Sequence, residues 1–245
     1  AYDIVINGLR RLEYRGYDSA GIVLEDTNNS FEVKKTKGKV SDLVEISDNL
    51  KATSHVGMGH TRWATHGVPS DRNSHPHVSN NGKIAIVHNG IIENYDTIKT
   101  MLIGKGFTFS SETDTEVLVN LIQYILDTQN VDFPQAVRYA LNEVYGAYAI
   151  TVMHKDYPGV LVVGRLGSPL AIGLGDKEYF IASDASPFVE FTKEAVYLED
   201  GHMATISLEN GVDIRSIKEN EKIEPAIQEL KLSLEQIEKG GYEHF

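Results

Sequence analysis

The chain has 245 residues, of which 41% are hydrophobic and 24% are charged. This length and composition can supply one substantial core or two small ones, and they exclude a chain that is disordered throughout. With 23 Lys and Arg against 35 Asp and Glu, the net charge is −12, so the surface field repels phosphate backbones and anionic headgroups. Nucleic acid and anionic membranes are therefore poor candidates as partners.

The apolar runs and the residue inventory indicate the compartment. Runs such as residues 20–24 and 84–87 fall far short of the ~20 apolar residues that a bilayer-spanning helix needs. The first residues show neither the basic nor the apolar region of a secretory signal. The sequence contains no cysteine, which excludes a disulfide framework and a thiolate metal site and fits a reducing compartment. We expect a soluble, cytoplasmic protein.

The first elements along the chain are a predicted helix and a predicted hairpin. Apolar residues recur at helical spacing over residues 4–12, until Arg15-Gly16 interrupts the pattern. Two β-rich runs, residues 20–24 and 31–35, flank a cluster of turn residues and predict a hairpin.

A glycine- and histidine-rich stretch follows at residues 55–67, and a polar loop comes after it. The next apolar run predicts a strand over residues 83–88, which Asn89-Gly90 closes. An Asn-Gly pair at this place is also typical of an ordinary type I′ turn.

Three helices are predicted next. The first spans about residues 93–104 and stops at a glycine. The second begins at a capping box made by Thr113 and Glu116, after which apolar residues mark one face as far as residue 126. The third begins at Pro134, where the missing N–H is harmless, and runs to about residue 144.

The period changes to two after the third helix, and the tail from residue 218 also alternates as an extended segment does. Helices bunched between two sets of strands favour an α+β fold, a pair of sheets with helices outside, over a βαβ alternation. No internal repeat divides the chain, so one domain is expected. The predicted short strands cover residues 147–153, 160–164, 170–173, 179–182, 195–198, 202–208 and 212–217.

Six of the nine histidines crowd into one stretch that also holds the only tryptophan. Such crowding suggests a metal site, but no His-x-x-x-His helix, no cysteine and no nearby pair of carboxylates completes a ligand set. Histidines bonded to backbone groups in loops are therefore favoured over a metal site. The six are His55, His60, His66, His75, His77 and His88.

Arg62 is the centre of the first cluster with chemical character. It lies in residues 61–67 (TRWATHG), where it precedes the indole of Trp63 and is followed by Thr65 and His66. An arginine fork matches a carboxylate bidentately, and a nearby Thr or His adds a directed donor. The group suits an α-carboxylate, although Arg62 could equally pair with a surface acid.

Two further clusters complement this one. Asn89 and Gly90 could aim a side-chain amide and a backbone N–H at one oxygen, which is the construction of an oxyanion hole. Asp114 stands at the start of the second predicted helix, where it could pair with a ligand ammonium or simply act as a first-turn acid. Together with Arg62, these residues describe a pocket for an amino acid whose side-chain carbonyl is attacked.

Several long motifs, spread over the full length of the chain, match those of one protein family. The sequence resembles the glutaminase domains of the glutamine–fructose-6-phosphate aminotransferase (isomerising), or glucosamine-6-phosphate synthase, family. These are class II glutamine amidotransferases of the N-terminal nucleophile hydrolase superfamily. The matching segments are residues 11–21, 61–67, 73–77, 88–94, 111–116, 165–170 and 182–184.

The resemblance implies a four-layer αββα sandwich that hydrolyses L-glutamine through a thiolate and passes ammonia to a sugar site. It also implies that no metal or organic cofactor is needed. Arg62, Trp63, Thr65, His66, Gly90 and Asp114 would hold the substrate, Asn89 and Gly90 would bind the oxyanion, and Arg15 and Gly16 would act as a lid or its support. Residues 1–238 would form the glutaminase domain. Residues 239–245 would begin a linker to sugar-isomerase domains that bind fructose 6-phosphate.

One departure concerns the nucleophile, which in this family is an N-terminal cysteine on a short strand. The sequence contains neither, and it starts about one strand late, roughly ten residues by the spacing of a strand and turn. We assign no Thr, Ser or Lys of the sequence to the role of nucleophile in place of the cysteine. Two alternatives stay open: a module that binds glutamine or glutamate without turnover, and a metal-dependent hydrolase built on the histidines. Homo-oligomer formation is also left open.

Overall fold

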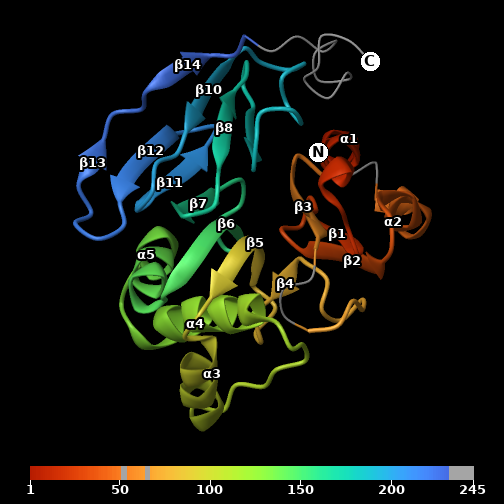
Figure 1. Ribbon diagram of the computed structural model, residues 1–245. Helices are drawn as coiled ribbons and strands as arrows, with labels where there is room; N and C mark the ends of the chain where they lie inside the picture. The colour runs from red at the N-terminus through yellow and green to blue at the C-terminus, as the bar shows by residue number, and fades with distance from the viewer. Residues whose placement is uncertain (51–53, 64–66, 232–245) are drawn as a thin grey trace.

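The computed structural model describes residues 1–50, 54–63 and 67–231 (Figure 1). The expected limit between a domain over residues 1–238 and a linker over residues 239–245 lies outside the described residues. In the part of the chain that is described, no helix is long and apolar enough to cross a bilayer.

The helical elements group into two sets along the chain. The first set precedes or interrupts the first strands, and the second set follows the fifth strand. The helices are α1 (Tyr2–Leu12), α2 (Val40–Ser47), α3 (Tyr95–Gly104), α4 (Asp114–Thr128) and α5 (Phe133–Glu143), with 3₁₀ turns η1 (Glu13–Arg15) and η2 (Asp48–Leu50).

The strands fall into three sheets. A small sheet of order β2-β1-β3 contains β1 (Ser19–Glu25), β2 (Phe31–Lys37) and β3 (Val56–Arg62). A second small sheet of order β14-β10-β8-β9 contains β8 (Ala171–Leu174), β9 (Tyr179–Ala182), β10 (Glu194–Tyr197) and β14 (Ile227–Glu229). A large sheet of order β13-β12-β11-β7-β6-β5-β4 contains β4 (His77–Val78), β5 (Ile84–Ile92), β6 (Gly146–His154), β7 (Leu161–Leu166), β11 (His202–Ser207), β12 (Gly211–Ser216) and β13 (Lys222–Ile223).

The large sheet is buried on both faces, as the alternation along β5 shows. Ile84 and Ile86 belong to the core that α3, α4 and α5 cover, whereas Ala85 belongs to a cluster on the opposite face. Successive side chains of a strand point to opposite faces. The sheet therefore separates a helical layer from a second layer of strands.

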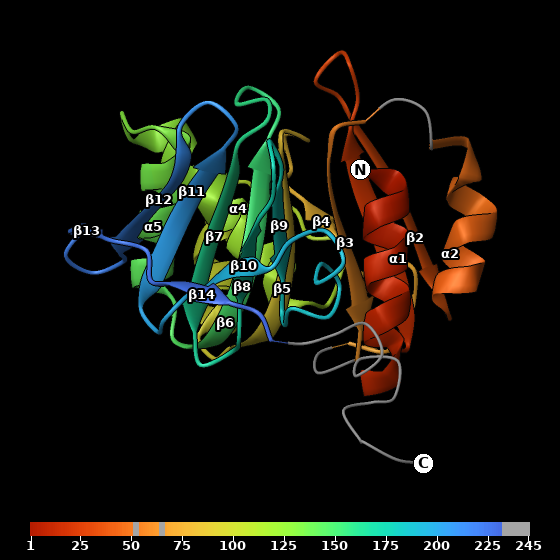
Figure 2. The ribbon, with the colours of Figure 1, turned by 90° about the horizontal axis from the view of Figure 1, so that it is seen from above.

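Both small sheets pack on that opposite face. Met58 of β3 lies in the cluster of Ala85, and Ile172 of β8 lies in a cluster with Ala149 of β6. Helices α1 and α2 lie outside the small sheet β2-β1-β3 (Figures 1 and 2). The four-layer α+β sandwich is confirmed, and its second strand layer consists of two separate pieces.

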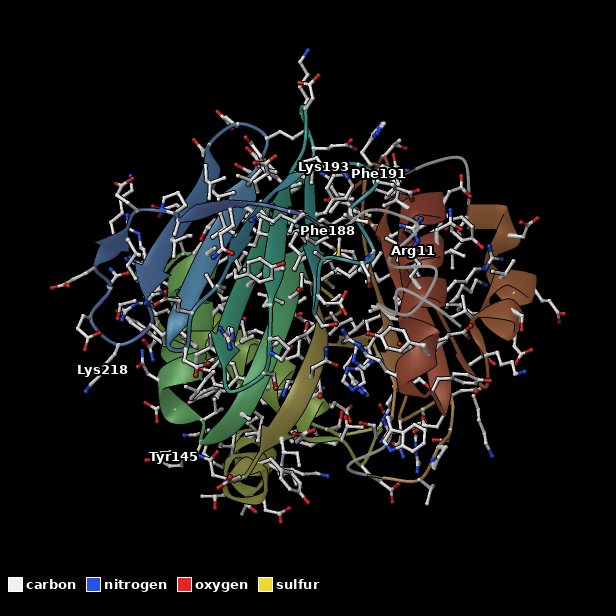
Figure 3. The ribbon with its side chains drawn as sticks, turned by 45° about the horizontal axis from the view of Figure 1, so that its top comes forward. Arg11, Tyr145, Phe188, Phe191, Lys193 and Lys218 are labelled. Carbon is white, nitrogen blue, oxygen red and sulfur yellow. The ribbon has the colours of Figure 1, made fainter. Side chains whose placement is uncertain are left out.

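Helix α1 spans both pieces of the divided layer. Its Leu9 packs in the core under β1, while Ile4 contacts the cluster around Phe188, which follows β9. Arg11 of α1 donates to the carbonyl of Ser186 at 3.2 Å and pairs with Glu190 at 2.9 Å. Figure 3 labels Arg11 and Phe188 on the two facing segments. These contacts hold α1 over the gap between β3 and β9, which are edge strands of their sheets.

Most predicted elements are confirmed. The hairpin is β1-β2, the predicted helices correspond to α1, α3, α4 and α5, and the strands after α5 correspond to β6 to β12. The capping box is half formed, because Thr113 accepts from the Glu116 amide at 3.3 Å while the Glu116 carboxylate bonds Ser110 and Ser111 instead. Helix α2 and strand β3 are present in addition to the predicted elements.

Candidate active site

A cavity of about 990 Å³ occupies the gap between β3 and β9. Helix α1 covers it from one side, and β5, β6 and β7 of the large sheet form its opposite wall. At the end of the cavity beside the last residues of β3, residues from distant parts of the chain come together with residues of β5. Thr65 and His66 lie outside the described residues. The predicted site residues that line the cavity are Arg15, Gly16, Arg62, Trp63, Asn89, Gly90 and Asp114.

Arg62 is the last residue of β3 and is only 4% exposed. Its Nη2 donates to the Gly67 carbonyl at 3.1 Å, and its Nη1 lies 3.7 Å from the Asp18 carboxylate. Burial lowers the pKa of the guanidinium from its ordinary value, against the opposing effect of Asp18 and Asp114. A buried guanidinium held in one orientation is suited to an incoming carboxylate.

Asp114 is the first residue of α4 and is 3% exposed. Its Oδ2 accepts from the Ile92 amide of β5 at 2.7 Å, and the Thr115 hydroxyl lies 3.4 Å from Oδ1. These bonds tie the helix start to the strand that carries Asn89. The carboxylate is thus held at the cavity wall with a negative charge available to a ligand ammonium.

Asn89 and Gly90 lie within β5, which continues to Ile92. The prediction that this pair closes the strand is therefore wrong, and the pair forms no turn. Both residues are paired in register with β6, Asn89 opposite Ala149 and Gly90 opposite Tyr148. Gly90 adopts a φ of 130°, a backbone conformation that residues with a side chain rarely adopt. Glycine therefore allows the strand to continue through this position. The pair thus sits on a rigid strand rather than on a loop.

Gly90 also has no room for a side chain. A Cβ placed there would lie 2.1 Å from the Ala147 carbonyl oxygen. A side-chain-bearing residue strained at a positive φ loses ~1–3 kcal/mol of stability. We expect Gly90→Ala to lower the free energy of unfolding by more than this, because the steric clash adds to the strain. Gly82→Ala is the matched control, because Gly82 has a φ of 72° but nothing within 4 Å. Thermal or denaturant unfolding measures both, and equal losses would contradict the steric argument.

Trp63 and Gly16 form the rim of the cavity. The indole is 68% exposed, and a Cβ on Gly16 would lie 2.5 Å from two of its ring carbons. Arg15 donates to the Ser183 hydroxyl at 2.8 Å and forms an ion pair with Asp184, which follows β9. Arg15 therefore links the segment after α1 to the segment after β9 across the cavity mouth.

The role of Arg15 and Gly16 as a lid or its support stays a prediction. If the link closes further over a bound ligand, glutamate should slow amide hydrogen exchange at residues 15–18. Exchange followed by mass spectrometry, with and without glutamate, measures this. Unchanged exchange at residues 15–18 while other cavity residues become protected would count against a lid.

Three of the clustered histidines form side-chain hydrogen bonds beside the cavity. His60, His77 and His88 bond Asn89 of β5 and two threonines at the start of α4. Burial lowers the pKa values of His75 and His77 well below the ordinary value of an imidazole, which favours the neutral form of both. Within the described ranges, no group of three or more His, Asp or Glu side chains is arranged to hold a metal ion. The bonds are His60 Nε2 with Asn89 Oδ1 at 2.8 Å, His77 Nε2 with the Thr113 hydroxyl at 3.0 Å, and His88 Nδ1 with the Thr115 hydroxyl at 2.9 Å.

Two solved structures share the fold of this chain over most of its length. Glutamine phosphoribosylpyrophosphate amidotransferase from B. subtilis superposes with a TM-score of 0.74 at 28% identity, over 89% of this chain and 47% of that one. A structure described as the allosteric regulatory enzyme of purine biosynthesis gives 0.76 at 28% identity, over 90% of this chain and 47% of that one. The fold is therefore of the N-terminal nucleophile hydrolase type.

Sequence comparison identifies the family. The family model described as "Glutamine amidotransferase domain" matches residues 20–232. This chain therefore belongs to the glutamine amidotransferase domain family. It is 50% identical to the glutamine–fructose-6-phosphate aminotransferase (isomerizing) of Bacteroides thetaiotaomicron and 44% identical to that of Pyrococcus horikoshii, over all of this chain in both cases. The chain spans 40% of the length of each of these relatives.

Proposed function

We propose that this chain binds L-glutamine in the cavity and is the glutamine-hydrolysing part of a glutamine–fructose-6-phosphate aminotransferase. One observation carries the proposal: Arg62, Asp114 and the Asn89-Gly90 pair, far apart in sequence, line one end of one cavity. A cation for the α-carboxylate, an anion for the α-ammonium and two donors for the amide oxygen match glutamine group by group.

The identity of the acceptor rests on the relatives. Their name describes an aminotransferase that acts on fructose 6-phosphate, and this chain spans 40% of the length of the Bacteroides thetaiotaomicron relative. We propose that sugar-isomerase domains in the remaining length receive the ammonia released here. A cytoplasmic location follows from that role and stays a prediction, as does a homo-oligomer.

We propose that the nucleophile is a thiol from outside the 245 residues, because the sequence itself contains none. We propose a cysteine at the head of an extended segment that lies in the cavity between β3 and β9. Among the described residues, β3 and β9 are the edge strands that face the cavity. Such edges offer backbone hydrogen bonds on both sides of an extended segment. A strand there would join the two small sheets into one layer.

The position of α1 supports this placement. At one end of α1, Ala1 lies beside Gly57, at the start of β3. Beyond the other end of α1, Gly16 lies beside Trp63, which follows β3. A strand leading into Ala1 along β3 would run antiparallel to it for about seven residues, or roughly 20 Å. Its first residue would then lie at the end of the cavity that holds Arg62 and Asn89.

The chemistry follows from these positions. The terminal amine of the leading cysteine accepts the thiol proton, and the thiolate attacks the side-chain carbonyl carbon of glutamine. The carbonyl oxygen becomes an oxyanion that the Asn89 amide and the Gly90 N–H stabilise. Collapse of the tetrahedral intermediate expels ammonia, once the terminal amine has returned a proton to the leaving nitrogen. Water then attacks the glutamyl thioester, which releases glutamate and restores the thiol.

Replacement of Arg62 tests substrate binding. We define the extended polypeptide as residues 1–245 preceded by a cysteine-led strand. With its cysteine changed to alanine, binding can be measured without turnover. Arg62→Ala should weaken glutamine binding roughly 10- to 100-fold, because a charge-assisted bond contributes ~1.5–3 kcal/mol. Calorimetric titration measures the Kd.

Arg215→Ala is the control for loss of a positive charge. Arg215 pairs with Asp213 on the surface at 2.8 Å and does not line the cavity. Its replacement should leave the Kd unchanged. If Arg62→Ala binds as tightly as the parent, Arg62 does not hold the substrate carboxylate.

The second candidate function is a module that binds glutamine or glutamate without turnover. The absence of cysteine from the sequence favours it. The two functions differ in one observable, ammonia release by the extended polypeptide. Tight binding with no ammonia release from a correctly folded extended polypeptide would favour the module.

A further inference from the structure

The side chain of Asn89 can serve an oxyanion only in one of its two amide orientations. Its nitrogen must face the cavity, because the amide oxygen would repel the developing negative charge. Asn89 is exposed at the cavity wall, and packing alone does not select between two orientations of nearly equal shape. Some neighbour must therefore distinguish the oxygen from the nitrogen.

His60 of β3 is that neighbour. Its Nε2 lies 2.8 Å from Asn89 Oδ1. A carbonyl oxygen has only lone pairs to offer, so Nε2 must carry the ring proton and donate it. With Oδ1 bound in this way, the amide nitrogen of Asn89 is turned away from His60.

The His60 ring is itself held in place. It stacks on His75 with ring centroids 4.3 Å apart and an interplanar angle of 17°. His75 is buried and accepts from the His88 amide of β5 through Nδ1 at 3.3 Å. The Thr115 hydroxyl, next to Asp114 on α4, lies 3.5 Å from His75 Nε2. The imidazoles thus connect Asn89 to the start of α4.

We propose that His60 is a positioning residue that orients the Asn89 side chain so that its N–H points at the oxyanion. The inference rests on the proposed function of Asn89. It gives the histidine cluster a role that needs no metal ion: the cluster holds the Asn89 side-chain amide in one orientation. The effect runs through Asn89, and His60 itself need not touch the substrate.

The charge of His60 does not supply an alternative explanation. Burial lowers the pKa of His60 to about 4, and the nearby His88 and Arg62 act in the same direction. The ring is therefore neutral near pH 7 and contributes no positive charge to the oxyanion. Its contribution is the direction of one hydrogen bond.

Two substitutions in the extended polypeptide separate the hydrogen bond from the ring. His60→Phe keeps an aromatic ring on His75 but cannot donate. We expect kcat to fall about 10- to 100-fold and KM to change by less than about threefold. The fall in kcat follows because a misoriented Asn89 amide stabilises the oxyanion less well. His60→Gln restores a donor at the reach of Nε2 and should recover kcat to within about fivefold of the parent.

His154→Phe is the matched control. His154 is a buried histidine that packs against Phe133 and Tyr157, away from the cavity. Its replacement should change thermal stability but not kcat. A fall in kcat as large as that of His60→Phe would show that any buried histidine has this effect, and it would overturn the proposal.

The double variant with Asn89→Ala tests whether His60 acts through Asn89. In the Asn89→Ala background, His60→Phe should lower kcat no further. If Asn89→Ala alone leaves kcat unchanged, the proposed function of Asn89 fails. If Asn89→Ala lowers kcat while His60→Phe has no effect or an independent one, only the positioning role fails.

A measurement on the unaltered chain does not depend on activity or on the folding of a variant. Nitrogen-15 NMR of the imidazoles of residues 1–245 distinguishes a proton on Nε2 from one on Nδ1. We expect the Nε2–H tautomer for His60. The Nδ1–H tautomer would place the amide nitrogen of Asn89 against His60 and would overturn the proposal.

Discussion

Changing the leading cysteine of the extended polypeptide to alanine should lower glutamine turnover by a factor on the order of 10⁶. The large effect follows from the site, because residues 1–245 contain no thiol and the covalent route is lost with the cysteine. Arg62 and Asp114 remain in place, so glutamine should still bind. Ammonia release and calorimetric binding, measured on the same two proteins, check both halves of this expectation.

Residues 1–245 alone provide a second comparison for the same prediction. They should release no more ammonia than the alanine variant and should bind glutamine or glutamate weakly. Turnover by residues 1–245 at a rate comparable with that of the extended polypeptide would show that the nucleophile lies within these residues, and that the thiolate mechanism is wrong.

The second large effect is expected from Asn89. Asn89→Ala in the extended polypeptide should lower kcat about 10²- to 10³-fold, with a smaller change in KM. The donor acts mainly on the charge that develops in the transition state, and its removal therefore affects the rate more than ground-state binding. Steady-state kinetics of ammonia release separate the two parameters.

Asn210→Ala is the control for this variant. Asn210 is an exposed asparagine that lines the other end of the same cavity, and the bond it makes to Ser207 uses its backbone amide. Its replacement should leave kcat unchanged. An Asn89→Ala variant that raises KM while keeping the parent kcat would contradict an oxyanion role.

Much of the fold could be predicted because the apolar pattern determines which faces are buried. The period of two after α5 corresponds to β6 to β12, and the periodic apolar face after Thr113 corresponds to α4. Side-chain chemistry also grouped Arg62, Asp114 and Asn89 into one pocket, and these residues line one cavity. Local pattern was sufficient for the elements, whereas the binding roles of the three residues stay predictions.

Strand β3 could not be predicted from local pattern because its glycines serve tertiary contacts. A Cβ on Gly59 would lie 2.6 Å from Val5 of α1, and one on Gly57 would lie 2.5 Å from Leu24 of β1. Glycine weakens a strand signal, although it permits the close approach of neighbouring elements. The strand is formed by pairing with β1, which lies far away in sequence.

The end of β5 and the histidine network were missed for a related reason. An Asn-Gly pair signals a turn locally, yet the nine-residue pairing of β5 with β6 carries the strand through it. The partners of His60 and His77, namely Asn89 and Thr113, are separated from them by 29 and 36 residues. Only the folded chain brings these side chains together.

The most direct test of the account is the site of covalent attack. An electrophilic analogue of glutamine, incubated with the extended polypeptide and followed by peptide mass spectrometry, reports which atom acts as the nucleophile. We predict a single label on the leading cysteine, reduced by added glutamate and slowed when Arg62 is changed to alanine. A label on a Ser, Thr or Lys within residues 1–245, in a protein that still turns over glutamine, would contradict the account.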